Sequence, residues 1–208
     1  MRRFLHRSGQ GGFSLLEVLI TLLIVSIGLL GVARLLARAH VSEMESYQRV
    51  QALILLSDIV ERLQINRLTA SCFAFTTDMT TGTPYIGADG DDLLGTPTCT
   101  ASVSAYNTQA VNTITTLDSL LKGSAETKDS ANAGAMIGAR ACISYNSGSE
   151  LLNSLGVAIS GTGEYTVSIA WQGLSETFAS TTNCANGLYG SELQRRVVST
   201  TLRLASLD

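Results

Sequence analysis

Apolar residues follow several patterns along the chain, and the first is an unbroken run from Phe13 to Leu36. The run is 24 residues long and contains no proline. About 20 helical residues, each rising ~1.5 Å, suffice to cross the hydrocarbon core of a bilayer. The run therefore predicts a membrane-spanning helix.

Beyond Leu36 the apolar positions recur at every third or fourth residue, which is typical of an amphipathic helix packed on a core. The pattern ends near Asn66, ahead of a stretch rich in Ser and Thr. We predict one helix over Ser14–Asn66, whose first half spans the membrane and whose second half packs on a globular domain. The apolar positions of the second half are Val41, Met44, Tyr47, Leu53, Ile54, Leu56, Val60 and Leu63.

Alternation of apolar and polar residues predicts strands in the C-terminal part of the chain. It is clearest at Glu164–Gln172, and further strands are expected at Ala139–Tyr145, Gly156–Ile159 and Leu193–Leu204. Glycine-containing turns between them suit hairpins, so an antiparallel sheet packed on the helix is expected. The predicted fold class is α+β.

The tract between helix and sheet, Thr76–Thr116, is polar, rich in Thr and low in hydrophobic periodicity. These features predict a long excursion over the surface. Within it, Asp89-Gly90-Asp91-Asp92 has the oxygen donors that Ca²⁺ prefers but lacks the later glutamate and the spacing of an EF-hand loop. We prefer a solvated turn and predict no metal site.

Composition and charge exclude several classes of function. The net charge is −3, and no cluster of Lys and Arg is interleaved with aromatic residues, so nucleic acid is set aside as a partner. The two histidines, His6 and His40, precede the globular domain, so it has neither a His-based triad nor a His-rich metal centre. There is no Gly-rich phosphate loop with Lys and no HExxH motif. We expect no enzyme, no catalytic residue and no cofactor.

The four cysteines, Cys72, Cys99, Cys142 and Cys184, all follow the apolar run, and none forms a CxxC pair. This spacing argues against zinc and against a thioredoxin-like site. In an exported domain disulfides are favoured, and three pairings are possible. Joining the first two and the last two closes the shortest loops, each stabilising by about 3 to 4 kcal/mol in the chain-entropy model. Free buried thiols are the alternative.

The segment ahead of the apolar run, Met1–Gly12, contains three arginines and no acid. A basic segment before an apolar run is a targeting arrangement, and its positive side should stay in the cytoplasm. The C-terminal domain would then face the periplasm. No A-x-A-like site ends the run before Arg34, so ordinary secretory cleavage is not expected.

Glu17 is the single charged residue between Phe13 and Arg34. A carboxylate in a membrane helix costs at least ~2.5 kcal/mol near the bilayer centre, so it normally has a partner and a function. In the alternative, Glu17 lies shallow enough to reach the head groups, or it complements the helix dipole in the first turn.

A resemblance to a known family rests on the string Gly12-Phe13-Ser14-Leu15-Leu16-Glu17-Val18-Leu19-Ile20. It resembles the class III signal of type IV prepilins and type II secretion pseudopilins: a short basic leader, a glycine, a phenylalanine and a glutamate four residues on, within an apolar helix. The resemblance covers about the first third of the chain. It implies that prepilin peptidase cuts between Gly12 and Phe13 and methylates the new amine of Phe13. It also implies that Glu17 pairs with that amine, on its own or a neighbouring subunit.

The resemblance implies a pilin-like division of the chain. Residues 1–12 would be the leader, 13–38 the transmembrane and assembly half of the helix, 39–66 its amphipathic half, and 67–208 the periplasmic globular domain. The implied partners are prepilin peptidase, other minor and major pilins, the inner-membrane assembly platform and membrane lipid. The protein would reside in the inner membrane as a single-pass protein and then in the pilus.

The C-terminal part resembles the PilV-type minor pilins, also called pilus modification proteins, at Gly163 through Trp171, at Cys184 and at Gln194-Arg195-Arg196-Val197-Val198. The implied function is that of a minor pilin that supports initiation of pilus assembly or a tip complex. The alternatives are a type II secretion pseudopilin and a signal-anchored periplasmic binding or adhesion protein that never polymerises. Arg195 and Arg196 are interpreted as exposed strand charges rather than a pair that contacts a partner.

Overall fold

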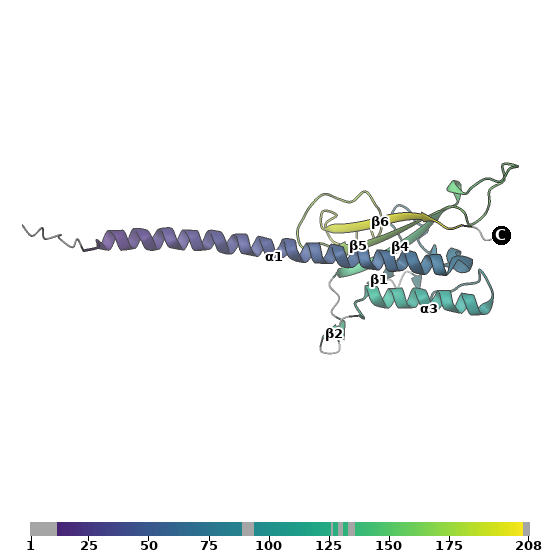
Figure 1. Ribbon diagram of the computed structural model, residues 1–208, viewed down its shortest axis with the longest axis horizontal. Helices are drawn as coiled ribbons and strands as arrows, with labels where there is room; N and C mark the ends of the chain where they lie inside the picture. Colours follow the sequence, from purple (N-terminus) through teal and green to yellow (C-terminus); the bar gives the residue numbers. More distant parts are fainter. Residues whose placement is uncertain (1–11, 89–93, 126, 129–130, 133–135, 206–208) are drawn as a thin grey trace, which may run out of the picture. The chain divides into compact units, whose positions relative to one another are not determined.

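The computed structural model describes residues 12–88, 94–125, 127–128, 131–132 and 136–205 (Figure 1). The chain divides into two compact units, Met1–Glu43 and Met44–Asp208. The expected leader, apart from Gly12, lies outside the described residues. The segment Asp89-Gly90-Asp91-Asp92, for which we predict a solvated turn rather than a calcium loop, also lies outside the described residues.

The long helix α1 runs from Leu15 to Ile65, one residue inside the predicted bounds at each end. At its start the Ser14 hydroxyl accepts a hydrogen bond from the amide of Leu16, as an N-cap serine does. At its end the Asn66 side chain donates to the carbonyl of Arg62. The chain then continues as a 3₁₀ segment, η1 (Arg67–Phe73).

The sheet has four antiparallel strands in the order β1-β4-β5-β6. Their bounds are β1 (Ile86–Gly87), β4 (Ile137–Asn146), β5 (Glu164–Gln172) and β6 (Arg195–Arg203). A separate pair of short strands comprises β2 (Thr127–Lys128) and β3 (Ala131–Asn132). The predicted α+β class, a long N-terminal helix with an antiparallel sheet, is confirmed.

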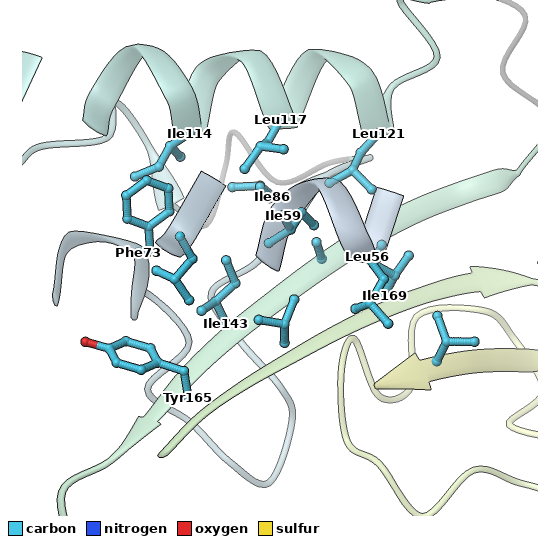
Figure 2. Packing of buried hydrophobic residues seen from close by; sticks show 14 of the residues in the cluster. Leu56, Ile59, Phe73, Ile86, Ile114, Leu117, Leu121, Ile143, Tyr165 and Ile169 are labelled. Atoms are coloured by element: carbon cyan, nitrogen blue, oxygen red, sulfur yellow. The ribbon is translucent and has the colours of Figure 1, made fainter. Parts of the chain in front are cut away.

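The core lies between the second half of α1, the inner face of the sheet and helix α3 (Ser104–Leu121) (Figure 2). Residues of β5 alternate as predicted, and the first side of the strand supplies Tyr165, Val167, Ile169 and Trp171 to this core. The other side is also covered: Ser168 and Ala170 are buried, because loops pack over the outer face of the sheet. Alternation located the strand but did not reveal this second covering layer.

The buried face of α1 differs in part from the predicted one. Leu56 and Leu63 are buried, whereas the other predicted positions from Val41 to Ile54 are exposed. The helix carries two apolar stripes, and the sheet covers the one that also contains small or polar residues. The residues of the buried stripe are Gln48, Ala52, Leu56, Ile59 and Leu63.

The prediction of a surface excursion over Thr76–Thr116 is wrong, because this tract contains β1 and most of α3. Every third or fourth residue of α3 is buried, and these residues are Ala110, Ile114, Leu117 and Leu121. The threonines between them are weak helix formers, which obscured the helical period. Their hydroxyls bond to carbonyls four residues back, as Thr113 does to Gln109 at 2.8 Å. Packing on the core stabilises a helix that propensity alone does not favour.

The prediction of a strand at Gly156–Ile159 is also wrong. The chain between β4 and β5 forms a narrow ribbon with one isolated bridge, between Leu152 and Ala158. The ribbon does not belong to the sheet, because Asn146, the last residue of β4, pairs directly with Glu164, the first of β5. The 17 residues between them therefore loop out.

The outer face of the sheet is covered by residues 174–194 and by the loop before β1. Cys142 of β4 is bonded to Cys184 of this covering segment. Arg195, 2% exposed, donates to the carbonyls of Ser180, Thr182 and Cys184. Its fixed fork of donors holds the segment in place.

Candidate functional site

The apolar run of α1 is exposed along its whole length. Each residue from Phe13 to Leu36 is exposed, and the large apolar side chains among them are between 48% and 84% accessible. Within the described part of the chain, α1 is the one helix long and apolar enough to cross a membrane. Such an exposed surface is stable only in lipid or against other apolar helices.

The few polar groups of this run are satisfied inside the helix. The Thr21 hydroxyl donates to the carbonyl of Val18 at 2.9 Å, and the Ser26 hydroxyl to that of Leu22 at 2.7 Å. Neither group therefore needs water, which suits a hydrocarbon environment. Added Cβ atoms at Gly28 and Gly31 would meet nothing within 4 Å. Contacts within the chain thus do not explain these glycines, whereas close packing against other helices does.

Glu17 lies in the first turn of α1. Its carboxylate forms no ion pair with another described residue, and the nearest arginine along the helix, Arg34, is 17 positions away. Gly12 and Phe13 precede the helix in irregular, exposed chain. The peptide bond between them is therefore accessible, and the end that its cleavage would create lies one helical turn from Glu17.

Both disulfides join the pairs that the loop-length comparison favoured. Cys72 is bonded to Cys99 and Cys142 to Cys184, at sequence separations of 27 and 42 residues. The first pair fastens η1 to the chain before α3, and the second fastens the covering segment to β4. They hold the globular unit together at some distance in sequence from the spanning run.

The interpretation of Arg195 and Arg196 as exposed strand charges is wrong, because both side chains are used inside the domain. Arg195 is buried and bonded to Glu192 as well as to the covering segment. Arg196 donates to the carboxylate of Glu45 at 3.2 Å and to the carbonyl of Ser175 at 2.6 Å. The alternation of apolar and polar residues along β6 does not distinguish an arginine that is solvated from one that is hydrogen-bonded within the domain.

Sequence analysis missed the cluster that Glu45 forms. The amide and hydroxyl of Ser175 donate to Glu45 at 2.9 and 2.7 Å, beside the guanidinium of Arg196. Desolvation raises the pKa of Glu45, but the hydrogen bonds from Ser175 and the charge of Arg196 outweigh it and leave that pKa below its ordinary value. No sequence signal connects residues 130 positions apart.

The described residues contain no group of three or more His, Cys, Asp or Glu placed to hold a metal ion. Two cavities of about 380 and 450 Å³ are each lined in part by residues of η1. They share Ser71 and Ala101, and neither contains a paired nucleophile and base among its lining residues.

Comparison with known families matches residues 7–33 to the model of the prokaryotic N-terminal methylation motif. No curated protein and no solved structure matched the chain. The match spans the Gly12-Phe13 junction, Glu17 and most of the apolar run, which are the residues just described.

Fold and motif together indicate a class of protein. The chain carries the class III signal of type IV pilin-like proteins at the start of a long helix, followed by an antiparallel sheet. These features support a type IV pilin-like or pseudopilin protein, and they point to a structural role rather than an enzymatic one. The signal implies processing by prepilin peptidase, anchoring in a membrane and assembly with other pilins.

Proposed function

We propose that this protein is a minor pilin of a type IV pilus, of the PilV type, which supports initiation of pilus assembly or a tip complex. The observation that carries the proposal is the methylation motif leading into a helix whose apolar surface the rest of the chain leaves exposed. A helix of this kind needs lipid before assembly and other apolar helices afterwards. Both requirements are met by a subunit that leaves the inner membrane for a filament.

Processing supplies the chemistry for assembly. In the proposal, prepilin peptidase cleaves between Gly12 and Phe13 on the cytoplasmic side and methylates the new amine of Phe13. The leader contributes three of the 14 basic side chains, so 14 − 3 = 11 remain against 17 acids. Cleavage thereby removes the arginines that interact with the cytoplasmic leaflet. Residues 13–38 stay in the bilayer, and residues 67–208 remain in the periplasm.

The new cation gives Glu17 an ionic partner. Opposite charges a few ångströms apart attract far more strongly in a medium of low dielectric than in water, and a lone carboxylate there is penalised. Docking against a neighbouring subunit, on the inner-membrane assembly platform, would satisfy the amine of one chain and the carboxylate of another. Residues 39–66 would carry the globular domain on the same helix.

We expect Glu17→Val to block incorporation while leaving insertion and cleavage intact. Loss of one member of a buried pair commonly costs about 3 to 5 kcal/mol, so recovery in sheared filaments should fall at least about tenfold. The control is Glu43→Val, because the Glu43 side chain is 81% exposed. Immunoblots of the sheared and membrane fractions measure the distribution, and normal recovery of Glu17→Val in filaments refutes this role.

Intact mass and N-terminal sequencing, in strains with and without the peptidase, test the processing step. The mature chain should begin at methylated Phe13, and a larger residue at Gly12 should leave the 12-residue leader attached. A chain that still begins at Met1 in a strain with working peptidase contradicts the proposal.

A type II secretion pseudopilin is the second candidate, because it shares the same motif. Deletion separates the two: loss of twitching motility indicates the pilus, and loss of protein secretion indicates the pseudopilus. A signal-anchored binding or adhesion protein that never polymerises is the third candidate. Failure of prepilin peptidase to shift the gel mobility of the chain would favour it.

A further inference from the structure

The ribbon between β4 and β5, residues 150–161, is a built structure rather than a loose loop. Two backbone hydrogen bonds close it, from Asn153 to Val157 at 2.8 Å and from Ile159 to Leu151 at 2.7 Å. At its turn the Asn153 side chain accepts from the amides of Leu155 and Val157 at 3.0 and 2.9 Å. Side chains on this ribbon are therefore held in a defined arrangement.

The ribbon displays apolar side chains to the surroundings. Residues that face each other across an antiparallel pair point to one side, so Leu151, Val157 and Ile159 share a face. Leu155, at the turn, is 85% exposed. The segment thus has the composition of a buried strand, which is why the sequence predicted one, yet the fold leaves it uncovered. The exposed members are Leu151 at 55%, Leu152 at 65%, Leu155 at 85%, Val157 at 58% and Ile159 at 37%.

The ribbon offers no charge to a partner. Its one ionisable residue, Glu150, accepts from the Tyr145 hydroxyl at 2.5 Å and from the amide of Gly161 at 3.1 Å. The ribbon has no Lys or Arg, the residues that bind anionic lipid head groups. An uncharged apolar surface with fixed geometry suits a protein partner better than a membrane.

A cavity of about 380 Å³ adjoins the base of the ribbon. Ser160 and Gly161 line it together with Arg67 and Leu68, which follow the end of α1. Arg67 is exposed, and its guanidinium forms no ion pair with any described residue. Leu68 is 56% exposed. An available cation therefore stands beside the apolar ribbon, at the rim of a hollow large enough to admit a side chain.

We propose that the ribbon and this cavity form a docking surface for the globular domain of another pilin-like subunit. The partner would present apolar side chains to the shared face of Leu151, Val157 and Ile159, and a carboxylate to Arg67. The inference rests on the proposed function, which supplies such subunits, and adds the surface they contact. An arginine at the edge of an apolar patch is a common anchor in protein interfaces.

A photo-crosslinking amino acid in place of Leu155, in the full-length chain and in filament-producing cells, tests the surface directly. The expected adduct contains a second subunit whose own peptides include the N-terminal methylation motif. The matched control places the same amino acid at Phe178, which is 95% exposed on the covering segment and should not yield that adduct. Both positions are exposed, so neither replacement disturbs the core.

Variants then test the chemistry of the contact. Val157→Ser and Arg67→Glu should each lower the yield of the Leu155 adduct about tenfold, the scale of losing one interface anchor. Arg67→Lys should keep most of it, and Arg49→Glu, a charge reversal at an exposed position of α1, should change nothing. If neither Val157→Ser nor Arg67→Glu lowers the yield of the Leu155 adduct, the proposal is overturned.

The remaining outcomes are also decisive. Adducts with lipid, with an unrelated protein or equally from Phe178 overturn the docking surface, as does the absence of any adduct. The intact mass of the protein in the same samples tests the proposed function separately. A chain that still begins at Met1 refutes processing, whereas a processed chain found in filaments without the Leu155 adduct refutes the docking surface alone.

Discussion

Glu45 joins helix α1 to two segments that follow it by more than 100 residues. Its carboxylate accepts from Ser175, in the loop after β5, and from Arg196, in β6. The side chains of Glu45 and Arg196 are 24% and 17% exposed, so water screens their interaction only in part. This cluster ties the start of the globular unit to its outer loops.

The depressed pKa of Glu45 sets the sign of a pH dependence. Because the folded form holds the ionised carboxylate, this contribution to stability is present above the ordinary pKa of 4.5 and is lost as the pH falls through the lower folded value. Glu45→Gln should lower the free energy of unfolding by about 1 kcal/mol at neutral pH, and the difference should shrink on acidification below 4.5.

Urea unfolding in detergent, followed by the fluorescence of the single tryptophan, Trp171, measures the effect of Glu45→Gln. Glu43→Gln is the control, since that carboxylate is 81% exposed. A Glu45→Gln variant that differs from the wild type by the same amount at every pH would show that the ionised form is not what stabilises the cluster.

At the scale of elements, α3 illustrates how packing overrides propensity. Four of its side chains reach the core, and Ile114 is 1% exposed. The rest of its surface is largely threonine, asparagine and serine, and the hydroxyls of Thr115, Thr116 and Ser119 donate to carbonyls four residues back in the helix. In isolation such a sequence gains little from being helical.

Ile114→Ala should therefore cost about 2 to 5 kcal/mol, the range for truncating a fully buried isoleucine. Thr115→Ala, one residue away and exposed, should be neutral or slightly stabilising, because alanine is the better helix former. Urea unfolding gives both values. Equal losses for the two variants would mean that α3 does not pack on the core as described.

At the scale of the whole molecule, the globular unit has a covering on each face of its sheet. Helices α1 and α3 bury one face, and the loop segment 174–194 buries part of the other. On that outer face the Arg140 guanidinium lies between the rings of Tyr85 and Tyr189, 5.3 and 4.9 Å from their centres. Gly82, with a φ of +68°, lets the neighbouring loop approach the covering segment, because a Cβ there would lie 1.8 Å from the Asn183 carbonyl oxygen.

Removing the Cys142–Cys184 disulfide by double alanine substitution should cost about 4 kcal/mol in the chain-entropy model. Removing Cys72–Cys99 should cost nearly as much, since the loop lengths enter only as a logarithm. The two variants should differ in hydrogen exchange: the first should lose amide protection across residues 174–194, and the second should not. Unchanged protection there in the first variant would indicate that Arg195 alone holds the covering segment.

Much of the fold was readable from short-range pattern. The unbroken apolar run and the spacing of three and four residues predicted α1 within one residue at each end, and clean alternation predicted β5 with the bounds observed. Two elements were missed for opposite reasons. Threonines concealed the stripe of α3, and an apolar composition at Gly156–Ile159 suggested a core strand where the chain forms an exposed ribbon.

The sequence by itself determined the long helix, the class of fold and the motif at the membrane end, because each depends on residues that are neighbours along the chain. Only the tertiary structure decided which apolar stripe of α1 is buried, that Arg195 and Arg196 are bonded internally, and that the ribbon remains exposed. Those outcomes depend on contacts between segments up to 151 positions apart. A local sequence pattern does not indicate which distant segment will pack on a given residue.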